Sequence, residues 1–258
     1  MKTKIINKEG KAGKEIEMPK AFSGKIRNDI LQKVFEVQKG VLKQAYGSKP
    51  GAGAQYSASG IIRHRRHVWK TGYGKGMSRV PRKIMSRHGS SFNWIGATVS
   101  STRGGRRPHA PRAEKNLFKK INKKELLIAF ISGFAGTMDK KAISAKFGVE
   151  AEGAVFSSEV LGLKTREFKK ILENVFEGVK VWKEKKVRAG RGKMRGRKYK
   201  SNAGMLFVIA SDEDMKRKGV DVVHVNDLMI HDLAPNGVAG RIVSYSENAI
   251  KEIGERFQ

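Results

Sequence analysis

Hydrophobic positions recur with a regular spacing near the two ends of the chain but not between them. Residues 2–6 and 14–18 flank a Gly-containing turn and predict two short strands. From Arg27 to Ala45 the apolar residues recur at helical spacing, and Gly47 is placed to end that helix. The first 46 residues therefore predict two strands followed by one helix.

Helical spacing returns in the C-terminal half. Asn122 and Glu125 resemble a capping box in front of an apolar helix. Asp139 can cap a second, short helix that stops at Gly148, and Thr165 can cap a third. This region therefore predicts three helices in succession.

Three apolar runs, 204–212, 221–225 and 241–245, predict strands in the last part of the chain. The first, "GMLFVIASD", has no polar alternation, which is typical of a strand buried on both faces of a parallel sheet. Ser246 can cap a final helix. Because strands alternate with helices, we expect an α/β layered domain with a mostly parallel sheet.

Between Gly47 and Pro111 the periodicity stops, and glycine, serine and arginine dominate. A connection of roughly 65 residues is far longer than a compact domain normally contains. Ordering it would cost about 1–2 kcal/mol per residue, and its apolar side chains are too sparse to offset that cost. Either the segment is disordered when free, or a partner supplies the missing free energy. As an extended hairpin it could reach up to about 100 Å.

Positive charge is concentrated in two segments. Residues 37–113 contain 16 Lys or Arg and no Asp or Glu, and residues 180–200 contain 11 Lys or Arg and one Glu. Together they carry most of the net charge of +30, so the remainder of the chain is nearly neutral. Such a charge attracts polyanions, with nucleic acid as the natural partner and an anionic membrane surface second.

Several classes of protein are disfavoured by composition. The absence of Cys excludes a disulfide scaffold, thiol catalysis and Cys-ligated zinc. No apolar run approaches the roughly 20 residues needed to span a bilayer, and the N-terminus has no signal-peptide core. An intracellular protein fits best.

Aromatic side chains lie among the basic residues of the central segment. Trp69, Tyr73, Phe92 and Trp94 suit stacking on unpaired RNA bases, while arginines hold phosphates. The alternative is that these aromatics form a small cluster that pins the segment to its own domain.

Motifs for other chemistry are weak. "GYGKG" at 72–76 lacks the spacing and the preceding strand of a dinucleotide-binding loop. His64 and His67 have metal-ligand spacing but no neighbouring carboxylate. We therefore expect no catalytic residue and no metal site.

Five stretches resemble one known family. They are "RAGRGKMRGRKY" (188–199), "WKTGYGKGMSRVPR" (69–82), "RGGRRPHAPRAEK" (103–115), "DLAPNG" (232–237) and "GRIVSYSENAI" (240–250). In this order they resemble the large-subunit ribosomal protein four family in its archaeal and eukaryotic branch. The chain ends without the long basic extension of eukaryotic members, which favours an archaeal source.

The resemblance implies a Rossmann-like α/β domain on the outside of the large ribosomal subunit. It also implies a long loop buried in rRNA, with limbs near 48–70 and 82–112 and a tip near 73–79 that lines the nascent-peptide exit tunnel. Tyr73 follows the "TG" pair where the family commonly has Arg. The expected domains are a globular domain (1–46 and 114–258), an RNA-penetrating loop (47–113) and a second basic loop (183–201).

The resemblance further implies a non-enzymatic, cytoplasmic, ribosome-bound protein that supports subunit assembly. Its expected partners are large-subunit rRNA, neighbouring ribosomal proteins and the nascent polypeptide, with no membrane and no homo-oligomer. No cofactor is expected other than Mg²⁺ held by the rRNA itself. The expected tunnel-lining residues are Tyr73, Lys75, Met77 and Arg79. The expected rRNA-binding residues are Arg63, Arg65, Arg66, Trp69, Lys70, Arg79, Arg82, Lys83, Arg87, Arg103, Arg106, Arg107, Arg112, Arg188, Arg191, Lys193, Arg195, Arg197, Lys198 and Tyr199.

Two other functions are compatible with the charge pattern. A free RNA chaperone would use the basic segments alone and rarely needs a nearly neutral α/β domain. An RNA-modifying enzyme would need an acidic or histidine-lined pocket at the carboxyl ends of the parallel strands.

Overall fold

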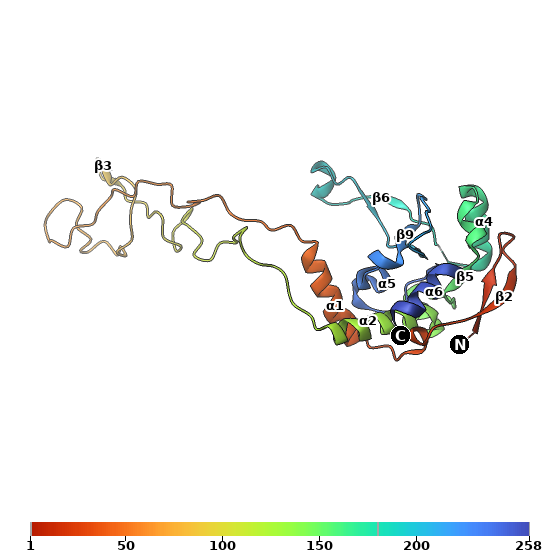
Figure 1. Ribbon diagram of the computed structural model, residues 1–258. Coiled ribbons are helices and arrows are strands. Elements are labelled where there is room, and N and C mark those ends of the chain that lie inside the picture. The colour runs from red at the N-terminus through yellow and green to blue at the C-terminus, as the bar shows by residue number, and fades with distance from the viewer. Residues whose placement is uncertain (1, 180, 258) are drawn as a thin grey trace. The chain divides into compact units, whose positions relative to one another are not determined.

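The computed structural model describes residues 2–179 and 181–257 and divides into two compact units. We call residues 1–42 and 118–258 the body, and residues 43–117 the loop. Figure 1 shows that the body contains nearly all of the regular secondary structure. The predicted boundaries, 46/47 and 113/114, lie a few residues inside these limits.

A six-stranded sheet forms the centre of the body, in the order β2-β1-β5-β10-β8-β9. The pairs β1–β5, β5–β10, β10–β8 and β8–β9 are parallel, and only β1–β2 is antiparallel. The predicted α/β fold with a mostly parallel sheet is therefore confirmed. The strands are β1 Lys2–Ile6, β2 Ala12–Glu17, β5 Ala154–Phe156, β8 Leu206–Ile209, β9 Asp221–His224 and β10 Val243–Ser246.

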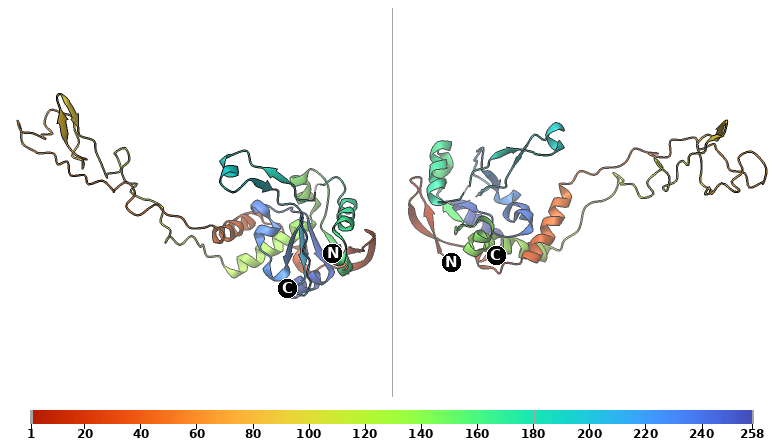
Figure 2. Two further views of the ribbon diagram at one scale, coloured as in Figure 1. Left: turned by 90° about the horizontal axis from the view of Figure 1, so that it is seen from above. Right: turned by 180° about the vertical axis from the view of Figure 1, so that it is seen from behind.

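Helices cover the sheet, as the views in Figure 2 show. Side chains of α1, α2, α5 and α6 join one hydrophobic cluster, and side chains of α3 and α4 join a second. The body thus has three layers. The helices are α1 Asn28–Val41, α2 Lys123–Met138, α3 Lys140–Phe147, α4 Thr165–Val175, α5 Ile230–Leu233 and α6 Glu247–Arg256.

Strand β8 shows why its sequence is continuously apolar. Leu206 and Val208 belong to the first hydrophobic cluster, whereas Phe207 and Ile209 belong to the second. All four are fully buried, because successive side chains point to opposite faces and both faces are covered. Strand β9 lies at the edge of the sheet and is only half-buried.

Local capping accounts for several helix ends. The Asp139 carboxylate accepts the backbone N–H of Lys141 at the start of α3, and Gly148 ends that helix with φ +70°. Ser246 Oγ accepts the N–H of Ala249 at the start of α6. These three predictions are confirmed.

Three capping predictions need correction. Helix α1 ends at Val41 with Leu42 as its C-cap, so Gly47 does not end it. Asn122 stands at the N-cap of α2, but its side chain makes no capping hydrogen bond. Of the two hydrogen bonds of a capping box, only one is present: the Glu125 carboxylate accepts from the backbone N–H of Asn122. Glu125 also forms an ion pair with Lys33 at 2.7 Å. Thr165 is the first residue inside α4, so the N-cap position belongs to Lys164.

One polar pair lies at the centre of the apolar body. Tyr245 and Thr137 are both fully buried, and their hydroxyl oxygens are 3.0 Å apart. Thr137 Oγ1 donates to the Phe134 carbonyl at 2.7 Å, so the Tyr245 hydroxyl is the donor between the two side chains. Burial, partly opposed by this bond, raises the pKa of Tyr245.

We expect Thr137→Val to destabilise the body more than Tyr245→Phe. The first change leaves a buried hydroxyl without an acceptor, which costs about 1–3 kcal/mol, whereas the second removes the donor together with its need for a partner. Urea unfolding of the full chain measures both. The double variant should be at least as stable as Thr137→Val; a further loss would contradict the assigned direction of the bond.

Candidate nucleic-acid interface

The loop is a long hairpin whose two limbs run alongside each other (Figure 2). Near its base the Ser48 N–H donates to the Pro111 carbonyl at 3.2 Å, and farther out the Gly60 N–H donates to the Arg82 carbonyl at 3.0 Å. A short β-hairpin, β3 (Ser86–His88) and β4 (Ser91–Asn93), branches from it. Two short strands in 75 residues leave most of the backbone without a regular partner.

The loop has almost no core of its own. Of the side chains in residues 43–117, all of which the structure describes, only Arg82, Met85 and Ala97 are buried. This agrees with the prediction that apolar burial cannot offset the entropy of ordering the segment.

Arg82 is the centre of the loop's outer part and is only 7% exposed. Its guanidinium donates from Nη1 to the Trp94 carbonyl at 2.5 Å and from Nη2 to the Ser78 carbonyl at 2.9 Å. Its backbone bridges to both Gly60 and Gly96. In this conformation the Arg82 guanidinium joins distant parts of the loop to one another, whereas that of Arg87 bonds only to the carbonyl of Gly89, two residues away.

An aromatic cluster lies beside Arg82. The rings of Trp69, Phe92 and Trp94 have centroids 5.0–6.0 Å apart. Lys75 Nζ lies 4.6 Å from the Phe92 centroid and 4.8 Å from that of Trp94, so a cation covers part of the cluster. Three of the four aromatics therefore pack together as the alternative expected, but Tyr73 is not among them and the cluster joins loop residues to one another. Trp69 and Phe92 remain over 40% exposed.

The tip around Tyr73 is open. Tyr73 is 51% exposed, and the Arg66 guanidinium lies 5.5 Å from its ring centroid. Gly74 and Gly76 have φ of +68° and +60°, and a Cβ at either would meet nothing within 4 Å. These glycines are therefore required by backbone conformation rather than by a close neighbour.

The other predicted rRNA-binding residues lie mostly at the surface. Lys70 and Lys83 are half-buried, and Lys83 Nζ lies 3.9 Å from the Tyr56 ring centroid. Met77 of the predicted tunnel-lining set is half-buried. The exposed members are Arg63, Arg65, Arg66, Trp69, Arg79, Arg87, Arg103, Arg106, Arg107, Arg112, Arg188, Arg191, Lys193, Arg195, Arg197, Lys198 and Tyr199.

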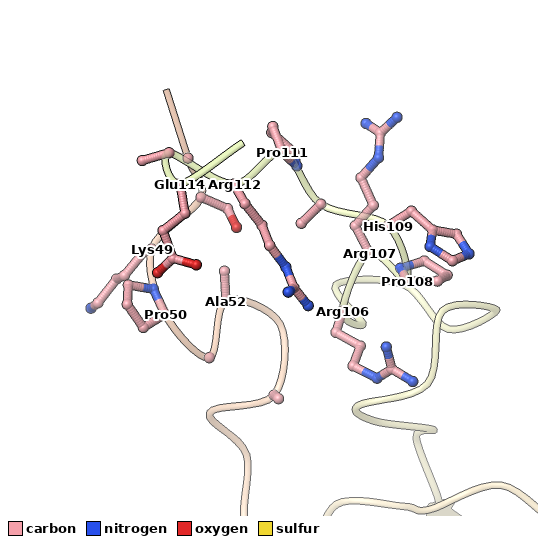
Figure 3. Close-up of a pocket in the computed structure, with 16 residues that line it drawn as sticks. Lys49, Pro50, Ala52, Arg106, Arg107, Pro108, His109, Pro111, Arg112 and Glu114 are labelled. Carbon is pink, nitrogen blue, oxygen red and sulfur yellow. The ribbon is translucent and has the colours of Figure 1, made fainter. Parts of the chain in front are cut away.

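A pocket opens between the two limbs at the base of the loop (Figure 3). Its lining includes Lys49 from the first limb and Arg106, Arg107, His109 and Arg112 from the second. In Figure 3 the Arg112 side chain points between the limbs, whereas Arg107 points away from them. Lys49 was not among the predicted site residues, although the acid-free composition of 37–113 was a signal for it.

The positive charges of the loop are not neutralised within the chain. Among the residues that the structure describes, no ion pair joins a Lys or Arg of 47–113 to a carboxylate. These cations are therefore available to an external anion.

The second basic segment is a short hairpin of the body. Strands β6 (Lys185–Val187) and β7 (Tyr199–Ser201) pair antiparallel, and a 3₁₀ turn, η3 (Arg191–Met194), closes them. We call residues 183–201 the basic hairpin. Its side chains from 184 to 200 are exposed or half-exposed, including Met194 at 82%. Its cations thus project into solvent from a backbone that is hydrogen-bonded.

Near the carboxyl ends of β8 and β10, the acidic side chain of Glu213 is used in hydrogen bonds within the body. Glu213 accepts from the Ala210 N–H, from Ser246 Oγ and from Asn248 Nδ2 at 2.5–3.0 Å, so its carboxylate is fully engaged. Within residues 2–179 and 181–257, no group of three or more His, Asp or Glu could hold a metal ion. An RNA-modifying site at this edge finds no support.

The exposed cations of the loop and of the basic hairpin are the features of a polyanion-binding protein. The model of the family described as "Ribosomal protein L4/L1 family" matches residues 16–256. Curated relatives named "Large ribosomal subunit protein uL4" occur in several archaea. The one from Nanoarchaeum equitans is 34% identical over 99% of this chain and 98% of its own length. Those from Methanocaldococcus jannaschii and Thermoplasma acidophilum are 34% and 35% identical and cover 100% and 98% of both chains.

The chain belongs to the ribosomal protein L4/L1 family. This membership confirms the resemblance to the large-subunit ribosomal protein four family, its archaeal affinity, and the expectation of a structural, non-enzymatic component of cytoplasmic ribosomes. None of the helices that the structure describes is long and apolar enough to cross a membrane.

We expect Arg82→Gln to loosen the outer part of the loop. It removes charged hydrogen bonds to two carbonyls, each worth about 1.5–3 kcal/mol. Amide exchange of Lys83 and Ala97, which donate to the Ile95 and Pro81 carbonyls, should accelerate about tenfold or more. Arg79→Gln, at an exposed neighbour, is the matched control and should leave these rates unchanged. Equal effects of both changes would show that Arg82 does not organise the loop.

Proposed function

We propose that this chain is a structural constituent of the large ribosomal subunit that binds large-subunit rRNA through its loop and its basic hairpin. The observation that carries the proposal is the acid-free stretch 37–113, most of which belongs to the loop. It holds 16 cations and no carboxylate, and only three side chains of residues 43–117 are buried. Phosphate contacts that release counterions supply the free energy that this loop lacks.

The finer parts of the proposal concern assembly and the tunnel. A segment that needs RNA to become ordered also orders that RNA, so the chain supports subunit assembly. The tip, with Tyr73, Lys75, Met77 and Arg79, lines the nascent-peptide exit tunnel. Neighbouring large-subunit proteins and the nascent polypeptide are further partners. The exposed Tyr73 ring and the open backbone at Gly74 and Gly76 fit a surface that faces a channel.

The runner-up is a free RNA chaperone. It would bind any RNA by charge alone and would not need the three-layered body. Sedimentation of native extract at low and high salt separates the two functions. Co-migration with large subunits in high salt supports the structural role, whereas release at moderate salt, or spreading across all RNA fractions, supports the chaperone.

Replacing Arg191, Arg195 and Arg197 together by Glu should weaken association with rRNA and reduce incorporation into large subunits. Each change replaces an exposed cation by an anion that phosphates repel. The matched control is Arg166, Lys169 and Lys170→Glu on α4, which changes the net charge equally at exposed positions. If the hairpin variant incorporates as well as the α4 variant, the basic hairpin is not an RNA contact.

A photo-crosslinking amino acid at Tyr73 should capture a stalled nascent chain. The same group at Phe147, which is 40% exposed on the body, is the control and should capture none. Crosslinks are detected by gel shift of the labelled nascent chain. Assembled subunits that yield no crosslink from Tyr73 would contradict the tunnel assignment while leaving the rRNA-binding role intact.

A further inference from the structure

The returning limb of the basic hairpin is fixed to the body by a buried arginine. Arg241, just before β10, is only 4% exposed. Its Nη2 donates to the Ala203 carbonyl at 2.7 Å, and its Nε donates to the Gly204 carbonyl at 3.1 Å. Its Nη1 donates to the Asp232 carbonyl at 2.6 Å. Because residues 203 and 204 come two and three residues after the end of β7, Arg241 holds the end of the hairpin against the sheet.

The outgoing limb is tied to the same place through Asp221. One carboxylate oxygen, Oδ2, accepts from Arg241 Nη2 at 2.6 Å, while Oδ1 accepts from Lys183 Nζ. Lys183 opens the hairpin, and its backbone N–H donates to the Gly219 carbonyl at 2.8 Å. A single carboxylate on β9 therefore joins both limbs. We call Lys183, Asp221 and Arg241 the hairpin anchor.

Two glycines show how closely this region packs. Gly219 has φ +105°, and a Cβ there would overlap the Trp182 indole. Gly204 has φ +64°, and a Cβ there would lie 2.7 Å from Lys183 Cγ. Any side chain at either position would displace the start of the hairpin.

Apart from the anchor, the described contacts between the hairpin and the body lie at its base, where the Lys183 N–H donates to the Gly219 carbonyl. No side chain from 184 to 200 is buried, and the β6–β7 pairing fixes the two strands to each other rather than to the body. The Arg241 charge is compensated by Asp221, as a buried charge requires. The pKa of Lys146 is lowered to about 8, mainly because burial removes its ammonium group from water. The positive charge of Arg241 is the second cause.

We propose that Lys183, Asp221 and Arg241 are positioning residues that hold the basic hairpin in one orientation on the body, ready to meet rRNA phosphates. This rests on the proposed function, because it assumes that the hairpin is an RNA contact. An anchored hairpin loses less conformational freedom on binding than a mobile one and therefore binds more tightly with the same charges.

Lys183→Gln tests the anchor with the least risk to folding, since its side chain is 24% exposed and the Arg241–Asp221 pair remains. Lys185→Gln is the matched control, because it removes the same charge two residues away at an exposed site. The chain has no Cys, so Met194→Cys at the hairpin turn takes one fluorophore for time-resolved anisotropy. Affinity is measured separately with an archaeal large-subunit rRNA transcript.

We expect Lys183→Gln to increase nanosecond motion of the label about twofold or more, with no change for Lys185→Gln. It should also weaken RNA binding about threefold beyond the control. An immobile label in Lys183→Gln, with an unchanged melting temperature, overturns the anchor whatever the RNA affinity. A mobile label with control-like affinity supports the anchor but overturns the hairpin's role in binding rRNA. Arg241→Met, where it folds, should mobilise the label still more.

Discussion

The constraint on which the molecule depends is positive charge without internal compensation. Sixteen cations lie in a stretch of 77 residues that has no carboxylate, and cations closer than a Debye length of about 8 Å repel one another. Such a stretch cannot collapse into a core, because neighbouring cations repel and few apolar side chains are present. The nearly neutral body can collapse, and the division into a body and a loop follows from this difference.

The body could be predicted from the sequence where the signal was local or periodic. The run at 206–209 was recognisable because both of its faces are buried, and Asp139 and Ser246 were recognisable because a cap is a contact over two or three residues. The inward positions of Arg82 and Arg241 could not be predicted. Composition identifies a basic residue but does not indicate whether distant carbonyls, such as those of Trp94 or Ala203, will surround it.

The two basic segments present their cations in different ways. The basic hairpin is short, and the ion pair between the buried Arg241 and the partly exposed Asp221 lies at its base. The loop relies instead on Arg82 and a partly exposed cluster of three aromatic rings. The hairpin therefore corresponds to a preformed surface, whereas the loop corresponds to a segment whose final order depends on its surroundings. Both share the property that buried arginines organise the backbone from which exposed arginines project.

The position of the loop within the sheet's connectivity has a consequence for folding during synthesis. Strand β1 pairs with β5, so Ile5 has no parallel neighbour until the ribosome has synthesised Val155. At typical elongation rates of roughly 5–20 residues per second, that delay is on the order of ten seconds or more. The whole loop, which ends at residue 117, is made before Val155, while the sheet is still open. The most highly charged part of the chain is therefore available to RNA before the body has folded.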